Sequence, residues 1–286
     1  MPRDGDHAQS GRAARKVRIG RIAICQRRRA MTDRKMSAFA NNDAVGNIFE
    51  LNDDTDFLAM AEDTVHVFRG HVCDTEHRGH IKSATELVVD ASDGFIPVWQ
   101  QNSVLRWRFQ RRSLLRYRYP DQIKVAARTL LAAAVSAWGD AAPIRFIEDD
   151  DAWDFEIAVR DANSCSVMGC TLASAFFPGE AQQELVIYPM MFQQDTQEQI
   201  ETLAHEIGHI FGLRHFFALE KEQAWPAELF GAHEAISIMN YGEQSQLTDT
   251  DRADLKLFYA MIWSGQLKDI NRTPIRQMKP FSANRP

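Results

Sequence analysis

Long apolar runs are scarce in this sequence of 286 residues. The longest stretch without a charged side chain, residues 162–179, contains asparagine, serine and proline, so it predicts a polar loop and a strand rather than a membrane span. The only apolar stretch near the N-terminus, residues 22–25, is too short for the apolar region of a secretory signal. We therefore expect no membrane span and a location that is cytoplasmic or reached by a non-classical secretion route.

Cysteine is also rare, with four residues at positions 25, 73, 165 and 170. None of them forms the Cys-x-x-Cys pair of a zinc ribbon or a thioredoxin-like site. Cys165 and Cys170 are close enough in sequence to pair across a short loop, but only in an oxidising compartment. The missing signal and the possible disulfide point to different compartments, and the sequence does not decide between them.

A net positive charge is confined to the N-terminal part of the chain. Residues 1–38 hold eleven Lys/Arg and three acids, an excess of +8, whereas the whole chain has a formal charge of −6, which leaves about −14 for the rest. Nucleic-acid binding needs a basic face for the phosphates, so this acidic body argues against nucleic acid as a partner.

The pattern of apolar residues divides the chain into four parts. Residues 1–50 lack periodicity and predict a disordered, basic and polar extension, whereas residues 51–99 contain short apolar runs typical of a small module. Residues 100–265 are expected to form the main domain, and residues 266–286 a C-terminal tail.

The main domain is expected to alternate strands and helices. Apolar residues alternate with arginines from Val104 to Tyr119, which predicts a half-buried strand or hairpin. Pro120 begins a helical apolar stripe that runs to about Trp138. The other expected elements are strands near 144–147, 155–159, 171–177 and 184–188, and helices over 195–212 and 248–265. This order predicts an α/β fold, in which a mixed twisted sheet packs on two main helices and a third helix follows near the C-terminus.

Three histidines and a glutamate have the spacing of a metal site, in the stretch His205-Glu206-Ile207-Gly208-His209-Ile210-Phe211-Gly212-Leu213-Arg214-His215. Histidines four apart on a helix project from the same face and can converge on one ion. Glu206 lies beside the first histidine, where its carboxylate can reach a metal-bound water. The third histidine requires the chain to turn, and Gly212 is a residue that can end a helix with a positive φ. Three protein ligands leave one position open, which is typical of catalytic rather than structural zinc.

This stretch resembles the metzincin motif H-E-x-x-H-x-x-G-x-x-H, and the Met-turn of that family is matched at Ser237-Ile238-Met239-Asn240-Tyr241. The resemblance covers about residues 100–264 and implies a metzincin-like catalytic domain with one zinc ion. It implies that Met239 lies beneath the zinc ligands. Tyr241 resembles the tyrosine of astacins and serralysins, which can ligate zinc at rest and then stabilise the oxyanion.

The strand expected over 171–177 resembles the matrixins instead. In that family the matching edge strand binds the extended substrate, which implies this role for Ser174, Ala175 and Phe176. Ser174 stands where matrixins have a histidine ligand of a structural zinc, and the aspartates of their calcium loop are missing after Gly179. We therefore expect one catalytic zinc, with no second zinc and no calcium in that loop.

The expected function is hydrolysis of peptide bonds in proteins or peptides by a monomeric zinc endopeptidase, with Glu206 as the general base. Residues 51–99 are expected to act as a pro-segment if Cys73 occupies the zinc of a latent zymogen; the alternative is an ordinary cysteine of a small folded module. A different class of function, a zinc protein that binds peptides without turnover, has no need of a base at Glu206.

Overall fold

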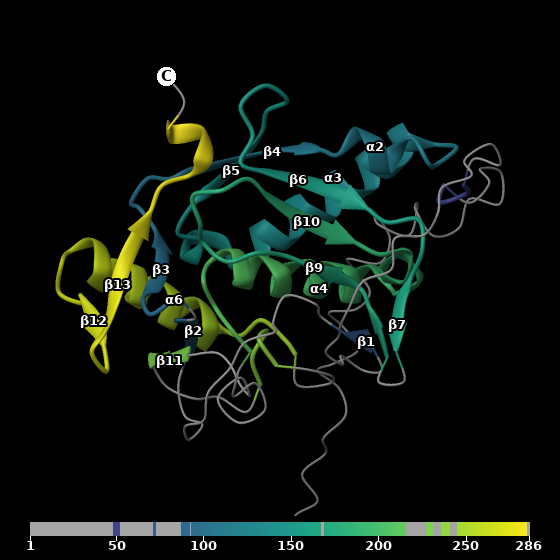
Figure 1. The fold of residues 1–286 in the computed structure, drawn as a ribbon. Helices are drawn as coiled ribbons and strands as arrows, with labels where there is room; N and C mark the ends of the chain where they lie inside the picture. Colours follow the sequence, from purple (N-terminus) through teal and green to yellow (C-terminus); the bar gives the residue numbers. More distant parts are fainter. Residues whose placement is uncertain are drawn as a thin grey trace, which may run out of the picture. The chain divides into compact units, whose positions relative to one another are not determined.

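The computed structural model describes residues 48–51, 71–72, 87–91, 93–166, 169–215, 227–230, 236–240 and 245–284 (Figure 1). Contacts divide the chain into two units, residues 1–44 and 45–286, and all described residues belong to the second. Among these described residues, no helix is both long and apolar enough to cross a membrane.

The centre of the fold is a five-stranded mixed sheet with the strand order β5-β4-β6-β10-β9. Its strands are β4 (Val104–Phe109), β5 (Arg145–Glu148), β6 (Phe155–Val159), β9 (Ala173–Ser174) and β10 (Gln183–Ile187). The pairs β4–β5, β4–β6 and β6–β10 are parallel, whereas β9 is antiparallel to β10. Strand β9 is thus the last strand of this described sheet, and its antiparallel pairing makes the sheet mixed, as predicted.

Two long helices pack beneath this sheet, α3 (Pro120–Trp138) and α4 (Thr196–Ile210) (Figure 1). The sequence of β4 shows why one face of the sheet is covered and the other is not. Leu105, Trp107 and Phe109 are buried in the core, while the alternate arginines are partly exposed on the other face. Helix α3 begins at a proline and ends at Gly139, whose φ is 58°. The indole of Trp138 donates to the Ala204 carbonyl at 3.0 Å, which fixes the end of α3 against α4.

The strand or hairpin predicted over residues 104–119 is confirmed for residues 104–109 and wrong after them. After β4 the chain forms the short helix α2 (Arg111–Leu114) and then irregular structure. The arginines that continue the alternation are not on one strand face: Arg116 pairs with Asp161 and Arg118 pairs with Glu50. Because β4 already has β5 and β6 as neighbours, no further strand can pair with it. The strand expected over 171–177 is also only partly correct: Thr171 ends β8 (Gly169–Thr171) and Ala173–Ser174 form β9, whereas residues 175–177 belong to no strand.

A smaller three-stranded sheet has the order β1-β8-β7, with β1 at His71–Val72 and β7 at Ser164–Ser166. A disulfide joins Cys165 and Cys170, which face each other in the β7–β8 pair. The pairing that the sequence left open is therefore present.

The segments expected as an N-terminal module and a C-terminal tail both contribute strands to the fold. Strand β3 (Ile96–Trp99) pairs in parallel with β13 (Thr273–Met278), and β13 also pairs with β12 (Asp269–Ile270). Strand β2 (Leu87–Asp90) pairs with β11 (Ala227–Phe230). Ser282 then donates from its backbone nitrogen and its hydroxyl to Asp154, at 2.6 and 3.0 Å.

The third helix, α6 (Asp249–Trp263), has the predicted ends. Thr248 and Asp251 form a capping box, in which each side chain accepts from the backbone nitrogen of the other. The 3₁₀ turns are η1 (Gly139–Ala141), η2 (Pro189–Gln193) and η4 (Phe281–Asn284). The α/β fold with a mixed sheet, two main helices and a C-terminal helix is thus confirmed.

Candidate metal centre

Helix α4 runs from the surface into the core, where it places the first two histidines. Its N-cap is Asp195, whose carboxylate accepts from the Glu198 backbone nitrogen at 2.9 Å. From Thr202 to Ile210 every residue of α4 is buried. The helix ends at Phe211, and Gly212 turns the chain with a φ of 91°. A Cβ on Gly212 would lie 3.1 Å from the Pro97 carbonyl oxygen, so both conformation and space favour glycine there.

The turn brings the third histidine to the first two. His205, His209 and His215 are 2%, 0% and 0% exposed, and one potential ligand atom from each lies within 4.8 Å of the others. The Nε2 atoms of His205 and His215 are 2.9 Å apart. The three predicted ligands therefore form one buried cluster, drawn from a helix and from the turn that follows it.

Backbone carbonyls orient two of the imidazoles. The Nδ1 of His205 lies 2.7 Å from the Ile238 carbonyl, and the Nδ1 of His209 lies 2.8 Å from the Leu213 carbonyl. A carbonyl can only accept, so each Nδ1 is the donor, and in the neutral ring each Nε2 would keep its lone pair for a metal. Neutral imidazoles held in this way are the ligands that zinc prefers, and the donor set fits a zinc ion.

The predicted Met-turn packs directly against α4. Met239 is buried, and a Cβ added to Gly208 would lie only 2.5 Å from its sulfur. Glycine at position 208 therefore makes room for the methionine beside the two histidines of the helix.

Helix α6 holds the Met-turn in place. The carboxylate of Asp251 accepts from the Ser237 hydroxyl at 2.6 Å and from the Ile238 backbone nitrogen at 3.2 Å. The carbonyl of Ile238 in turn accepts from Ser245 Oγ at 3.0 Å and from His205. One short path of hydrogen bonds therefore connects α6 to the imidazole of His205.

The C-terminal end of α4 is fixed by two aromatic side chains. The last carbonyls of a helix have no partner within it. The indole of Trp99 donates to the Ile210 carbonyl at 2.7 Å, and the hydroxyl of Tyr259 donates to the Phe211 carbonyl at 3.0 Å. Burial raises the pKa of Tyr259 well above its usual value, so this hydroxyl keeps its proton.

The structure describes some of the other predicted site residues but not all of them. Glu206 is 1% exposed, on α4 beside His205. Ser174 belongs to the edge strand β9, with Ala175 and Phe176 directly after it. Tyr241 and Cys73 lie outside the described residues.

No protein-family model and no curated protein matches this sequence. Among solved structures, myroilysin is 14% identical with a TM-score of 0.40, and the match covers 60% of this chain and 98% of that one. High choriolytic enzyme 1, a hatching enzyme zinc-protease from the medaka fish Oryzias latipes, is 14% identical with a TM-score of 0.37, over 59% and 96% of the two chains. Similarity at this level assigns no activity, so the functional case depends on this chain's own residues.

Several residues that build the site were not predicted from the sequence. The capping-box spacing identified Asp251 as the partner of Thr248 but gave no sign that it also binds the Met-turn. Trp99 reaches α4 from a strand 111 residues earlier in the chain, and no local pattern marks such a contact.

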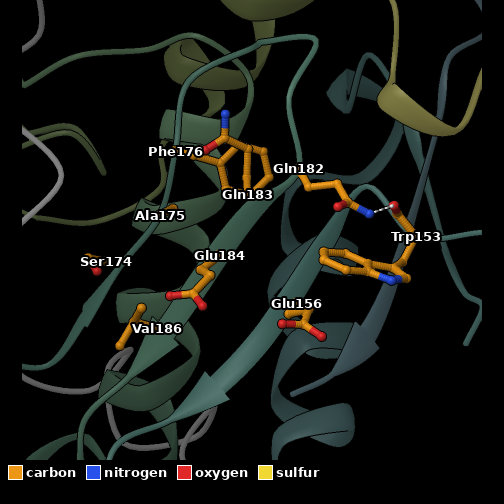
Figure 2. A pocket seen from close by; sticks show the side chains of 9 residues that line it. All are labelled: Trp153, Glu156, Ser174, Ala175, Phe176, Gln182, Gln183, Glu184 and Val186. Atoms are coloured by element: carbon orange, nitrogen blue, oxygen red, sulfur yellow. Dashed lines mark hydrogen bonds between the residues drawn. The ribbon is translucent and has the colours of Figure 1, made fainter. Parts of the chain in front are cut away.

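A pocket of about 460 Å³ lies beside the edge strand (Figure 2). Its lining includes Trp153, Glu156 and Glu184, and it contains none of the three histidines. Both carboxylates are engaged: Glu156 accepts from Arg108 at 2.9 Å, and Glu184 accepts from Gln110 at 2.6 Å. The pocket therefore adjoins the residues expected to bind substrate, Ser174, Ala175 and Phe176, rather than the three histidines.

Proposed function

We propose that this chain is a zinc-dependent endopeptidase, in which His205, His209 and His215 hold one zinc ion and Glu206 is the general base. The observation that carries the proposal is the buried cluster of three imidazoles, two of which have Nδ1 held by a backbone carbonyl. A structural zinc site has four protein ligands, whereas three ligands leave a position open for chemistry.

The reaction follows from the placement of Glu206. Zinc in such a site lowers the pKa of a bound water and polarises the scissile carbonyl. Glu206, next to His205 and shielded from solvent, takes the proton of the attacking water and passes it to the leaving amine. Tyr241 is proposed to stabilise the oxyanion as the reaction proceeds.

The edge strand is the proposed binding site for the substrate backbone. Strand β9 pairs only with β10 among the described strands of its sheet, and its residues contact α4. The ring of Phe177 lies edge-on to His209, with the centroids 5.5 Å apart. An extended peptide added along Ser174, Ala175 and Phe176 would thus run towards the histidines, as in β-augmentation.

Latency is a further part of the proposal. A thiolate is a strong zinc ligand, and Cys73 on the same chain would have a high effective concentration at the open position. Because Cys73 lies outside the described residues, this switch stays a prediction.

The test of catalysis is Glu206→Gln, which keeps the size of the side chain and removes the base; all chains compared carry Cys73→Ala, so that the proposed latency does not mask activity. Zinc content should match the unaltered protein, while hydrolysis of a peptide library should fall by a factor of about 10² or more. Glu201→Gln is the matched control, because it makes the same change on the same helix, five residues before the proposed base. This control should hydrolyse peptides at the normal rate.

Two outcomes would contradict the proposal. Full hydrolysis by Glu206→Gln would remove Glu206 from its role as base. A zinc-loaded chain that binds peptides but cleaves none, even when Cys73→Ala removes the proposed latency, would favour a binding protein instead.

A further inference from the structure

Strand β2 lies between β11 and the turn that carries the third histidine. On one side, β2 pairs antiparallel with β11 along its whole length, from Leu87 opposite Phe230 to Asp90 opposite Ala227. On the other side, Val89 forms a bridge with Leu213. The backbone nitrogen of Asp90 donates to the Gly212 carbonyl at 3.1 Å, and that of Arg214 donates to the Val88 carbonyl at 2.8 Å.

This pairing holds the segment that positions two of the three histidines. The Leu213 carbonyl accepts from His209 Nδ1 at 2.8 Å, and the peptides on both sides of Leu213 are hydrogen-bonded to β2. Two residues later the chain reaches His215. Strand β2 therefore fixes both the carbonyl that orients His209 and the approach of the backbone to His215.

A buried ion pair strengthens the same contact. The side chains of Arg214 and Asp90 are 0% and 6% exposed, with Nη1 4.0 Å from Oδ1. A guanidinium removed from water is strongly unfavourable unless an opposite charge compensates it. Asp90 supplies that charge, on the residue whose backbone also binds Gly212.

We propose that β2 is a permanent part of the metal centre and that Asp90 is a positioning residue, acting through Arg214 on the turn that carries His215. The inference rests on the proposed function, since the supported histidines are the proposed zinc ligands. It also sets a boundary for maturation. Val88, Val89, Asp90 and Ala91 are all buried. Removal of residues 1–91 would take away β2 and its hydrogen bonds to the turn that carries His215. An activating cleavage must therefore fall before Leu87.

The experiment compares variants of the full-length chain by two properties that do not depend on turnover. Zinc affinity is measured by competition with a chromophoric chelator, and coordination geometry is measured by the visible spectrum of the cobalt-substituted protein. Asp90→Asn removes the charge with little change of shape. Asp93→Asn makes the same change three residues later at an exposed position and is the matched control.

Asp90→Asn should weaken zinc binding by about 10- to 100-fold, the usual effect of losing a group that orients a metal ligand, and should change the cobalt spectrum. Asp90→Glu, which restores the charge, should recover part of the affinity, and Asp93→Asn should match the unaltered chain. Zinc affinity and a cobalt spectrum that are unchanged in folded Asp90→Asn would overturn the inference, even if the variant melts at a lower temperature.

A second variant keeps the test decisive if Asp90→Asn fails to fold. The double variant Asp90→Asn with Arg214→Met leaves no uncompensated buried charge and retains a long apolar side chain. It should fold and bind zinc more weakly than the unaltered chain; normal zinc affinity in this variant would overturn the role of the pair. If the unaltered chain binds no zinc, the proposed function itself fails, which is a different result from equal binding by all variants.

Discussion

Replacing Gly208 by alanine tests the packing between the metal helix and the Met-turn. The new Cβ would lie 2.5 Å from the sulfur of Met239, and 3.4 Å from its terminal methyl. Trp138 lies on the same side, with Cζ2 3.5 Å from the Cβ, so the methionine cannot move freely towards it. The substitution therefore forces Met239 away from α4.

Two opposing effects set the size of the change. Alanine is favoured over glycine inside a helix by about 1 kcal/mol. Adding a methyl group to a tightly packed core costs about 1–3 kcal/mol. Since Met239 is buried and both its sulfur and its terminal methyl lie close to the new Cβ, the packing cost should be the larger effect. The net expectation is a loss of about 0–2 kcal/mol in the free energy of unfolding.

A double-mutant cycle separates the two effects. Urea unfolding of the zinc-free protein is measured for Gly208→Ala, Met239→Ala and the combination of both. In the Met239→Ala background the clash is gone, so Gly208→Ala should become stabilising by up to about 1 kcal/mol. A Gly208→Ala variant that is more stable than the unaltered chain, or that has the same effect in both backgrounds, would refute this reasoning.

Two further predictions concern residues away from the histidines. Asp251→Ala leaves the buried donors of Ser237 and Ile238 without their acceptor, so it should lower the free energy of unfolding by about 3 kcal/mol and weaken zinc binding. Urea unfolding measures the first effect and chelator competition the second. Unchanged zinc affinity would show that α6 does not act on His205 through the Met-turn. Asn271 and Arg272, in the turn between β12 and β13, have positive φ angles of 49° and 73°. Arg272→Gly should therefore raise the free energy of unfolding by up to about 1 kcal/mol, whereas Asn271→Gly should not, because Asn271 also donates to Glu228 at 2.8 Å. A lower melting temperature for Arg272→Gly would contradict the first expectation.

Features that depend on neighbouring residues could be predicted from the sequence. The helix ends at Asp195 and Thr248 follow from side chains that cap the backbone within one turn. The spacing of His205 and His209 and the glycine at 212 likewise describe a local geometry, and the structure brings the three histidines together as expected.

Features that depend on distant pairing could not be predicted in this way. Strand β13 pairs with β3, which lies far earlier in the chain, and the polar residues around it gave it the composition of a tail. The role of Asp90 depends on Arg214, and a single sequence holds no sign that these two residues meet. The error after β4 has a related cause, because alternation cannot distinguish a second strand face from arginines that each pair with a different segment.

The most direct test of the central claim joins metal content to activity in the same sample. Zinc bound per chain and hydrolysis of a peptide library are measured before chelation, after chelation and after zinc is restored. The chain carries Cys73→Ala, so that the proposed latency does not mask activity, and His209→Ala in the same background is the variant lacking one buried ligand. We expect one zinc per chain, hydrolysis that is lost and regained with the metal, and neither property in His209→Ala. Hydrolysis that persists in the metal-free protein, or full zinc content in His209→Ala, would contradict it.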